Sequence, residues 1–346
     1  MENPIHIINL SRMVVMGSDL WGSVKTTVEK LGYKNPVVLD DTITRGIVGK
    51  KVSDDLNCDH YEVKSASMAE VHSIADILKK GRYDIVVSIG GGSVIDVGKL
   101  ASFNISIPFI SYPTVASHDG IASSRASIRD GEKKLSIEAQ PPIAIIADTK
   151  IVSQAPYRFL ASGCADLISN YTAVLDWQLA HKLKGEYYSE HAASLSSMSA
   201  KVTIDNADVI KEGLEESSRK VLKGLISSGV AMCIAGSSRP ASGAEHAFAH
   251  ALDMIAEKPA MHGEQCGVGS IMTMYLHRED KYKAIKEALE KLKAPTTAEE
   301  LGVTDTELIK ALTMAHKIRD RYTILGESGL TERAATKLAK VTGVID

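Results

Sequence analysis

Short aliphatic runs alternate with stretches of helical periodicity through the first 150 residues. The runs carry no polar alternation, which is typical of parallel strands buried on both faces. Between them, apolar residues recur at three- and four-residue spacing, as in residues 68–80, which stop at Gly81. This repetition predicts a doubly wound α/β domain. The predicted strands span residues 13–16, 36–39, 84–89, 107–110 and 143–147.

One segment departs from this alternation. Residues 121–137 mix small, polar and apolar side chains on either side of Asp130-Gly131. An Asp-Gly pair between two such runs favours a tight turn between antiparallel strands. We therefore expect a β-hairpin inserted before the last parallel strand.

The strand pattern disappears after residue 150, and long helical segments follow. Glycines and prolines such as Gly185, Gly236 and Pro259 separate them. The chain is therefore expected to form an α/β, Rossmann-like parallel-sheet domain over residues 1–150 and an all-α domain over residues 151–346. The predicted helices are 164–183, 190–210, 215–235, 243–255, 268–276, 282–292 and 306–317.

Composition narrows the class of protein. The 346 residues are 44% hydrophobic and 24% charged, which excludes a disordered or collagen-like chain. The net charge of −3 argues against a nucleic-acid or membrane-surface partner. The four cysteines are widely spaced, as expected of reduced thiols. Neither a signal peptide at residues 1–4 nor an apolar run long enough to cross a bilayer is visible, so we expect a cytoplasmic protein.

A glycine-rich turn joins the predicted strand 84–89 to a helix. Gly90-Gly91-Gly92-Ser93 lets the backbone approach a ligand closely and adopt positive φ, and the helix after it directs free N–H groups there. Neither G-x-G-x-x-G nor the P-loop motif fits. A tight turn without ligand is one interpretation, but three successive glycines favour a dinucleotide pyrophosphate. Ser93, Asp96 and Lys99 share one face of this helix.

Two other segments follow predicted strands. Asp40 ends the second strand, where a carboxylate either binds adenosine ribose hydroxyls or lies in a surface turn. Residues 112–120 follow the fourth strand and are rich in hydroxyl groups. Thr114, Ser117 and the later Ser123 are candidates to bind a cofactor, and Asp119 to bind a polar substrate. An ordinary polar loop is the alternative.

The helical half contains a carboxylate and two histidines suited to metal chemistry. Asp166 lies in one helix, His246 in another with His250 four residues on, and His262 at a loop–helix junction. A carboxylate with two imidazoles suits Zn²⁺ with an open position. By spacing alone, His246 and His250 also fit a packed pair in the core, and the motif is not H-E-x-x-H. The remaining histidines, His118 among them, are expected at the surface or in packing.

Together these residues resemble the superfamily of iron-containing alcohol dehydrogenases, glycerol dehydrogenases and dehydroquinate synthases. Residues 90–99 look like its cofactor motif. Residues 114–120, 237–246 and 261–265 are similar, in the same order, to segments of the archaeal sn-glycerol-1-phosphate dehydrogenases. The resemblance covers nearly the whole chain.

The resemblance implies reduction of dihydroxyacetone phosphate to sn-glycerol 1-phosphate with NADH or NADPH, the step that begins archaeal membrane-lipid backbone synthesis. It also implies a homo-oligomer that binds Zn²⁺, NAD or NADP and a small phosphate substrate. Asn170 stands where the iron-dependent branch has a histidine, which agrees with three metal ligands. The implied ligands are Asp166, His246 and His262. The implied substrate and catalytic residues are Asp119, Asp166 and His250. The implied cofactor residues are Gly90, Gly91, Gly92, Ser93, Val94, Ile95, Asp96, Thr114, Val115, Ala116, Ser117 and Ser123.

Several points stay open at this level. His250 is a candidate for relaying the proton to the developing alkoxide, directly or through water. Arg239 is either a clamp for the substrate phosphate or a structural residue at a helix start. The alternatives for the function are a glycerol dehydrogenase, a dehydroquinate-synthase-like lyase and a binding protein without activity. Asp166, in place of a glutamate, and few basic residues near the motifs argue against the lyase.

Overall fold

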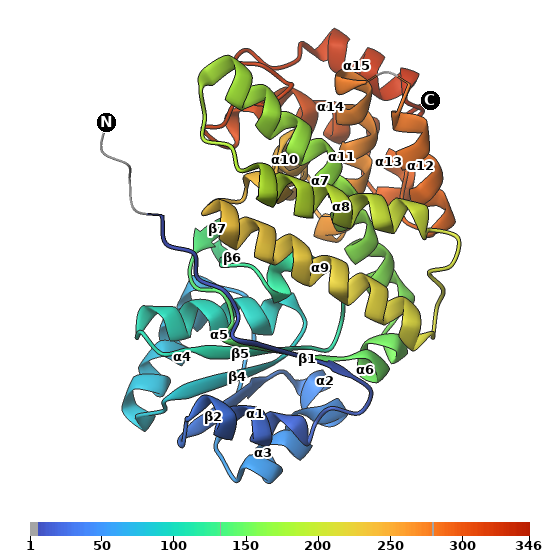
Figure 1. Ribbon diagram of the computed structural model, residues 1–346. Helices are drawn as coiled ribbons and strands as arrows, with labels where there is room; N and C mark the ends of the chain where they lie inside the picture. Colours follow the sequence, from blue (N-terminus) through green and yellow to red (C-terminus); the bar gives the residue numbers. More distant parts are fainter. Residues whose placement is uncertain (1–5, 132, 279) are drawn as a thin grey trace.

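The computed structural model describes residues 6–131, 133–278 and 280–346. A parallel sheet with flanking helices forms one half, and helices stacked on its upper side form the other (Figure 1). Residues 1–4, where no signal peptide is expected, lie outside the described part. Within that part, no helix is both long and apolar enough to cross a membrane, and no disulfide joins the cysteines.

The predicted parallel sheet is confirmed. Its strand order is β1-β8-β5-β4-β2-β3, and every pairing in it is parallel. The five predicted strands are present within two or three residues of their expected ends. The three-residue edge strand β3 was not predicted, because it contains no aliphatic run. The strands are β1 (Met13–Gly17), β2 (Pro36–Asp40), β3 (His60–Glu62), β4 (Ile85–Gly90), β5 (Phe109–Pro113) and β8 (Ala144–Asp148).

The two faces of the sheet bury different neighbours. Alternate residues of one strand point to opposite faces, so Val38 and Val87 pack with Val24 and Val52 in a cluster closed by α1 and α3. Leu39, on the other face, belongs to the larger core that continues into the helical half. The helices of this half are α1 (Ser23–Leu31), α2 (Thr42–Thr44), a π-helical turn (Arg45–Gly49), α3 (Lys50–Leu56), α4 (Met68–Gly81) and α5 (Gly92–Asn104).

The inserted hairpin is also confirmed. Strand β6 (Arg125–Asp130) pairs antiparallel with β7 (Lys133–Glu138). Gly131 has a φ of 58°, a conformation that favours glycine at the turn; residue 132 of the predicted turn lies outside the described part. The hairpin stands between the sheet and the helical half (Figure 1).

All the predicted helices of the second half are present. Two begin about six or seven residues earlier than expected, α7 at Tyr157 and α11 at His262, and the helices α6, α13 and α15 were not predicted. The bounds are α6 (Thr149–Gln154), α7 (Tyr157–Lys184), α8 (Glu190–Asp205), α9 (Glu215–Ala235), α10 (Ala244–Ile255), α11 (His262–His277), α12 (Tyr282–Lys291), α13 (Ala298–Leu301), α14 (Asp305–Met314) and α15 (Glu332–Val341), with 3₁₀ turns at Asp119–Ile121, Arg239–Ala241 and Ala315–Lys317.

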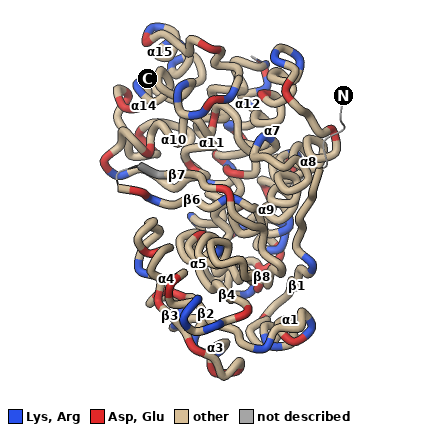
Figure 2. The backbone as a smooth tube through the Cα atoms, turned by 90° about the vertical axis from the view of Figure 1, so that its left-hand side faces the viewer, with Lys and Arg blue, Asp and Glu red and all other residues tan. Residues whose placement is uncertain are grey.

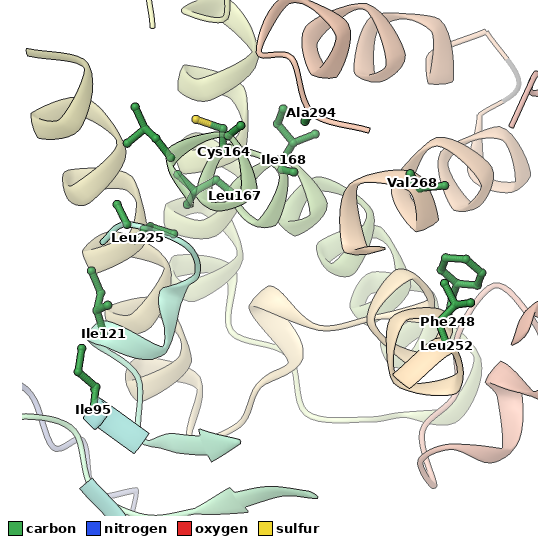
Figure 3. Packing of buried hydrophobic residues seen from close by; sticks show 14 of the residues in the cluster. Ile95, Ile121, Cys164, Leu167, Ile168, Leu225, Phe248, Leu252, Val268 and Ala294 are labelled. Carbon is green, nitrogen blue, oxygen red and sulfur yellow. The ribbon is translucent and has the colours of Figure 1, made fainter. Parts of the chain in front are cut away.

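One continuous apolar core ties the two halves together. Ile95 of α5 and Ile121 lie next to Leu225 of α9, which in turn neighbours Leu167 of α7 (Figure 3). The same cluster extends to Phe248 of α10. Charged residues of both signs are interspersed over both halves (Figure 2), in keeping with the small net charge of −3.

Candidate active site

A cavity of about 400 Å³ lies where the carboxyl ends of β4 and β5 meet the hairpin and the helical half. Its walls combine the glycine-rich turn, the loop after β5 and the histidine-bearing helices. The polar and glycine residues lining it include Gly92, Ser93, Asp96, Ser117, His118, Asp119, Ser123, Arg125, Ser162, Ser238, Ser242, His246, His250, His262 and Arg319.

The glycine turn brings the N-terminus of α5 to this cavity. Gly91 is the residue preceding the helix, with no side chain capping it. A Cβ on Gly92 would lie 2.2 Å from Nε2 of His118, so close packing explains this glycine. None of the three glycines has positive φ, so that part of the expectation is wrong. The free N–H groups at this helix end favour an anion.

Asp96 and Lys99 fasten this helix to its surroundings. The buried ammonium of Lys99 donates to Asp96 Oδ1 (3.1 Å) and to the carbonyls of Gly120 (2.7 Å) and Arg125 (2.5 Å). Asp96 Oδ2 accepts from the amide of Ser127 (3.0 Å). The pair therefore connects the turn, the loop after β5 and the hairpin, and Asp96 also lines the cavity.

The three predicted metal ligands converge. One ligand atom from each of Asp166 (α7), His246 (α10), His262 (α11) and Cys266 (α11) lies within 4.8 Å of the others. The buried Oδ1 of Asp166 has no hydrogen-bond partner among the described residues and lies 3.7 Å from Nε2 of His246. An oxygen left unsatisfied among imidazole nitrogens fits a cation, so the donor set suits zinc. Cys266 was not anticipated; it shares a face with His262 four residues earlier.

Electrostatics favour a cation at this point. Burial and, to a smaller extent, the charge of Asp119 raise the pKa of Asp166 to about 7, against the opposing effect of His246. Burial also raises the pKa of Asp119, and the hydrogen bond from Ser228 opposes this shift. Two buried carboxyl groups that resist ionisation together would be stabilised in their charged forms by a positive ion.

Neighbouring carboxylates hold the metal-site side chains in place. Glu245 Oε1 lies 3.0 Å from Nδ1 of His246, which leaves Nε2 facing Asp166. Glu264 accepts from the amide of Met261 (3.0 Å) and from Arg158 (2.6 and 2.7 Å), and so fixes the first turn of α11. His262 is the first residue of that helix.

Asp119 and Asp166 are linked directly. The amide of Asp119 donates to Asp166 Oδ2 (3.0 Å), and Ser228 donates to Asp119 Oδ2 (2.7 Å). Asn170 donates to the same serine (2.9 Å). Asn170, at the position of the iron branch's histidine, thus helps to position Ser228.

His250 lies beside the predicted metal ligands, with its ring stacked on His262 at 5.5 Å between centroids. Arg319 Nη2 is 2.9 Å from His250 Nε2. Since a guanidinium only donates, Nε2 is the acceptor and carries the lone pair. Burial lowers the pKa of His250 to about 4, so the imidazole is neutral near pH 7.

Other candidates act through the backbone or lie elsewhere. Val94, Ile95 and Ala116 are buried in the core, and Thr114 bonds the carbonyl of Gly90 through its amide (3.0 Å). Asp40 is buried against Arg45 (3.2 Å) and His60 (3.5 Å) rather than in the cavity. Of the predicted cofactor residues, Gly92, Ser93, Asp96, Ser117 and Ser123 line the cavity, whereas Gly90, Gly91 and Val115 are not among its lining residues.

Sequence reasoning missed part of the cavity wall. His118 lies 6.5 Å from His262 between ring centroids and packs over Gly92. Arg125 and Arg319 also line the cavity, so the expectation of few basic residues near the motifs is wrong. Arg239, the proposed clamp, is instead buried with its guanidinium on Glu186 and on the carbonyl of Tyr322 (2.8 Å). No motif signals Arg319, which comes from a segment far along the chain.

Known proteins resemble this chain over part or all of its length. The model of the iron-containing alcohol dehydrogenase family matches residues 15–156. A Thermococcus kodakarensis protein named glycerol-1-phosphate dehydrogenase (NAD(P)+) is 54% identical, with 100% of each chain covered. One of the same name from Methanothermobacter thermautotrophicus is 58% identical over 87% of this chain and 88% of its own.

Solved structures share the fold. A probable glycerol dehydrogenase from Sinorhizobium meliloti superposes with a TM-score of 0.81 at 18% identity, covering 99% of this chain and 100% of its own. Sulfoacetaldehyde reductase from Bifidobacterium kashiwanohense, in complex with NAD+, superposes with a TM-score of 0.77 at 17% identity, with 99% and 100% covered.

Proposed function

This chain belongs to the glycerol-1-phosphate dehydrogenase family of NAD(P)-dependent oxidoreductases, and on that premise we propose that Asp166, His246 and His262 hold the zinc ion of its active site. The enzyme interconverts dihydroxyacetone phosphate and glycerol 1-phosphate with a nicotinamide cofactor. The convergence of the three side chains, with Asp166 Oδ1 unsatisfied among them, is the observation that supports the metal assignment most directly.

These three residues would hold the zinc ion where it could supply Lewis-acid stabilisation of negative charge on the substrate oxygen. The chain's own residues prepare that position. Glu245 orients His246 through Nδ1, and the amide of Asp119 holds one oxygen of Asp166 so that the other faces the histidines. Both contacts hold the ligands in place before substrate arrives, which is how preorganised sites lower a barrier.

The cofactor lies along the carboxyl edge of the sheet in this proposal. Its pyrophosphate binds the N–H groups at the start of α5, next to Gly92 and Ser93. Ser117 and Ser123 offer hydroxyl groups along the same wall. His118 and His262, whose rings meet edge to face in the cavity wall, would then lie beside the bound cofactor.

Proton transfer is assigned to His250. Its imidazole is neutral, and its Nε2 lone pair accepts from Arg319 in this structure. In this proposal that contact opens when substrate binds, and Nε2 then accepts the proton of the alcohol during oxidation. In the direction of reduction the same atom returns a proton to the substrate oxygen, directly or through water. Asp119 contacts the polar end of the substrate, with its carboxylate oriented by Ser228.

The biological setting is part of the proposal. We expect a cytoplasmic homo-oligomer that makes the glycerol backbone of phospholipids. Light scattering of the purified protein tests the assembly. A mass of one chain across the working concentration range would contradict the expected oligomer.

The deciding assay follows NADH oxidation with dihydroxyacetone phosphate and identifies the enantiomer formed. Product that sn-glycerol-3-phosphate dehydrogenase cannot oxidise supports the sn-glycerol 1-phosphate assignment. Conversely, activity with glycerol but none with the phosphorylated substrate would favour a glycerol dehydrogenase. Substrate consumption without net NADH oxidation would favour the lyase.

The metal ligands are tested separately. His262→Ala is expected to lose bound zinc and activity together, because it removes one of three ligands. His72→Ala, on the surface of α4, is the matched control and retains both. Stoichiometric zinc in His262→Ala would refute the ligand set.

A further inference from the structure

Arg319 contributes a cationic side chain to the cavity wall. Its guanidinium lies 3.1 Å from Ser242 Oγ, 3.5 Å from Ser238 Oγ and 2.9 Å from His250 Nε2. All three acceptors are neutral, and a guanidinium carries five N–H donors. Among the described residues no carboxylate lies within ion-pair distance of Arg319, so its charge is not neutralised by a direct ion pair there.

Two more arginines, Arg239 and Arg321, lie near Arg319. Among the residues that the structure describes, the three have a single carboxylate at salt-bridge distance, Glu186, which is paired with Arg239. Arg321 donates to the carbonyl of Ser242 (2.6 Å) and to Ser238 Oγ (3.0 Å), both neutral. Glu186 lies in a two-pronged ion pair with Arg239. Across the described part of the chain this leaves Arg319 and Arg321 without a carboxylate partner at salt-bridge distance.

Burial and repulsion from other arginines disfavour the charged forms of Arg319 and Arg321. Burial, with repulsion from Arg125, lowers the pKa of Arg319 to about 10. Burial, with repulsion from Arg319 and Arg239, lowers that of Arg321 to about 9. Like charges gathered in a partly buried wall are stabilised by an anion that replaces the missing carboxylates.

The position of Arg319 relative to the predicted metal ligands indicates which anion it binds. His250 stands between Arg319 and the metal ligand His262, so the guanidinium is one side chain away from the reacting centre. We propose that Arg319, backed by Arg321 and flanked by the hydroxyls of Ser238 and Ser242, binds the phosphate of the three-carbon substrate. This rests on the proposed function and extends it, because it names the residues that select a phosphorylated substrate.

The cofactor's phosphates do not compete for this role. The hydrogen-bond partners of Arg319 among the described residues, Ser238, Ser242 and His250, flank the Arg239–Ala241 turn or lie in α10, in the helical half. The pyrophosphate is assigned to the N-terminus of α5, on the sheet side of the cavity. In this proposal the substrate phosphate therefore binds Arg319 and Arg321, at a place separate from the cofactor pyrophosphate.

Arg319→Gln tests the proposal in the full-length, zinc-loaded enzyme. Loss of the charged hydrogen bonds is expected to raise KM for dihydroxyacetone phosphate by about 10- to 100-fold with a smaller change in kcat. Inorganic phosphate is the probe for the subsite: it should inhibit the wild type in competition with dihydroxyacetone phosphate, and this inhibition should be lost in the variant. KM for NADH should change by less than about threefold.

Arg333→Gln is the matched control, since it removes an exposed arginine of α15 and should keep both constants. Arg319→Lys keeps the charge without the planar fork, and a smaller rise in KM is expected; it replaces the glutamine variant if that one does not fold. An unchanged KM and unchanged phosphate inhibition in the folded variant would overturn the proposal, as would a fall in kcat alone, which would make Arg319 a positioning residue for His250. Failure of the wild type to reduce dihydroxyacetone phosphate would instead refute the proposed function.

Discussion

One glycine allows the loop after β5 to pack closely against α7, the helix that carries Asp166. Gly163 lies in α7, three residues before Asp166, and a Cβ built there would stand 2.1 Å from the carbonyl oxygen of Ala116. Because real Cβ contacts essentially never fall below 3.0 Å, Gly163→Ala requires the two segments to separate by about 0.9 Å. Ala116 lies at the start of the stretch that leads through Ser117 to Asp119.

The loop, and not the helix, is expected to move. α7 has 28 residues, and its buried side includes Cys164, Leu167 and Ile168 within the main core. Moving it would disturb packing with several other helices. The loop is held instead by a few hydrogen bonds, such as that from Asp119 N to Asp166 Oδ2 (3.0 Å). The shift would therefore stretch the contact that orients the metal ligand.

Stability and activity should respond differently. Overpacking of this size costs about 1–3 kcal/mol, but replacing glycine inside a helix by alanine gains about 1 kcal/mol. The free energy of unfolding should then fall by only about 0–2 kcal/mol. A displacement near 1 Å at a reacting centre costs about 100-fold in rate. We expect kcat/KM of Gly163→Ala to fall by about that factor.

The assay compares kcat/KM for dihydroxyacetone phosphate with the urea unfolding midpoint. Gly46→Ala is the control, because Gly46 also lies in a helical turn and a Cβ there meets nothing within 4 Å. It should keep full activity. Wild-type kcat/KM in Gly163→Ala would refute the argument, and so would a loss of activity explained wholly by unfolded protein.

Two other predictions concern the metal. The pKa of Asp166 is about 7 without an ion, and only the ionised carboxylate binds zinc. Zinc affinity, measured by chelator competition, should therefore be nearly constant above pH 8 and weaken by at least about tenfold per pH unit below pH 6. An affinity that does not change between pH 8 and pH 5 would contradict this. Glu245→Gln should weaken zinc binding by about 10- to 100-fold, because it loosens the contact to Nδ1 of His246. The control Glu307→Gln, in the first turn of α14, should leave zinc binding unchanged. Equal zinc affinities of the two variants would show that Glu245 is not needed for metal binding.

The elements were readable from sequence where their signal is local. Val86 and Val87 lie in an aliphatic run because both faces of β4 are buried, and Asp130-Gly131 specifies a turn through positive φ at the glycine. Edge strand β3 has only three residues, with Tyr61 half-buried, so no run marks it. α11 begins before its expected start because its first turn, at His262, is stabilised by Glu264 and Arg158 rather than by apolar periodicity.

The site was readable only in part, for a physical reason. Asp166 and His246 are flanked by small residues that let helices approach closely, and that pattern is local. Arg319 has no such context, because its place in the cavity depends on the path of the chain after α14, which is set by tertiary packing such as that between α10 and α14. His118 likewise becomes part of the wall because Gly92, from another segment, leaves room for its ring.

Net charge and local charge serve different purposes in this protein. A chain with 40 basic and 43 acidic residues has little overall field to attract anionic ligands. Charge is instead segregated locally, in and behind the cavity wall: the carboxyl groups of Asp119, Asp166 and Glu245 lie close together where a cation is expected, and the guanidinium groups of Arg319 and Arg321 lie close together where a phosphate is expected. His250 stands between the two groups and contacts the guanidinium of Arg319. A substrate with an oxygen at one end of a short carbon chain and a phosphate at the other is complementary to both groups at once, whereas glycerol would meet only the first.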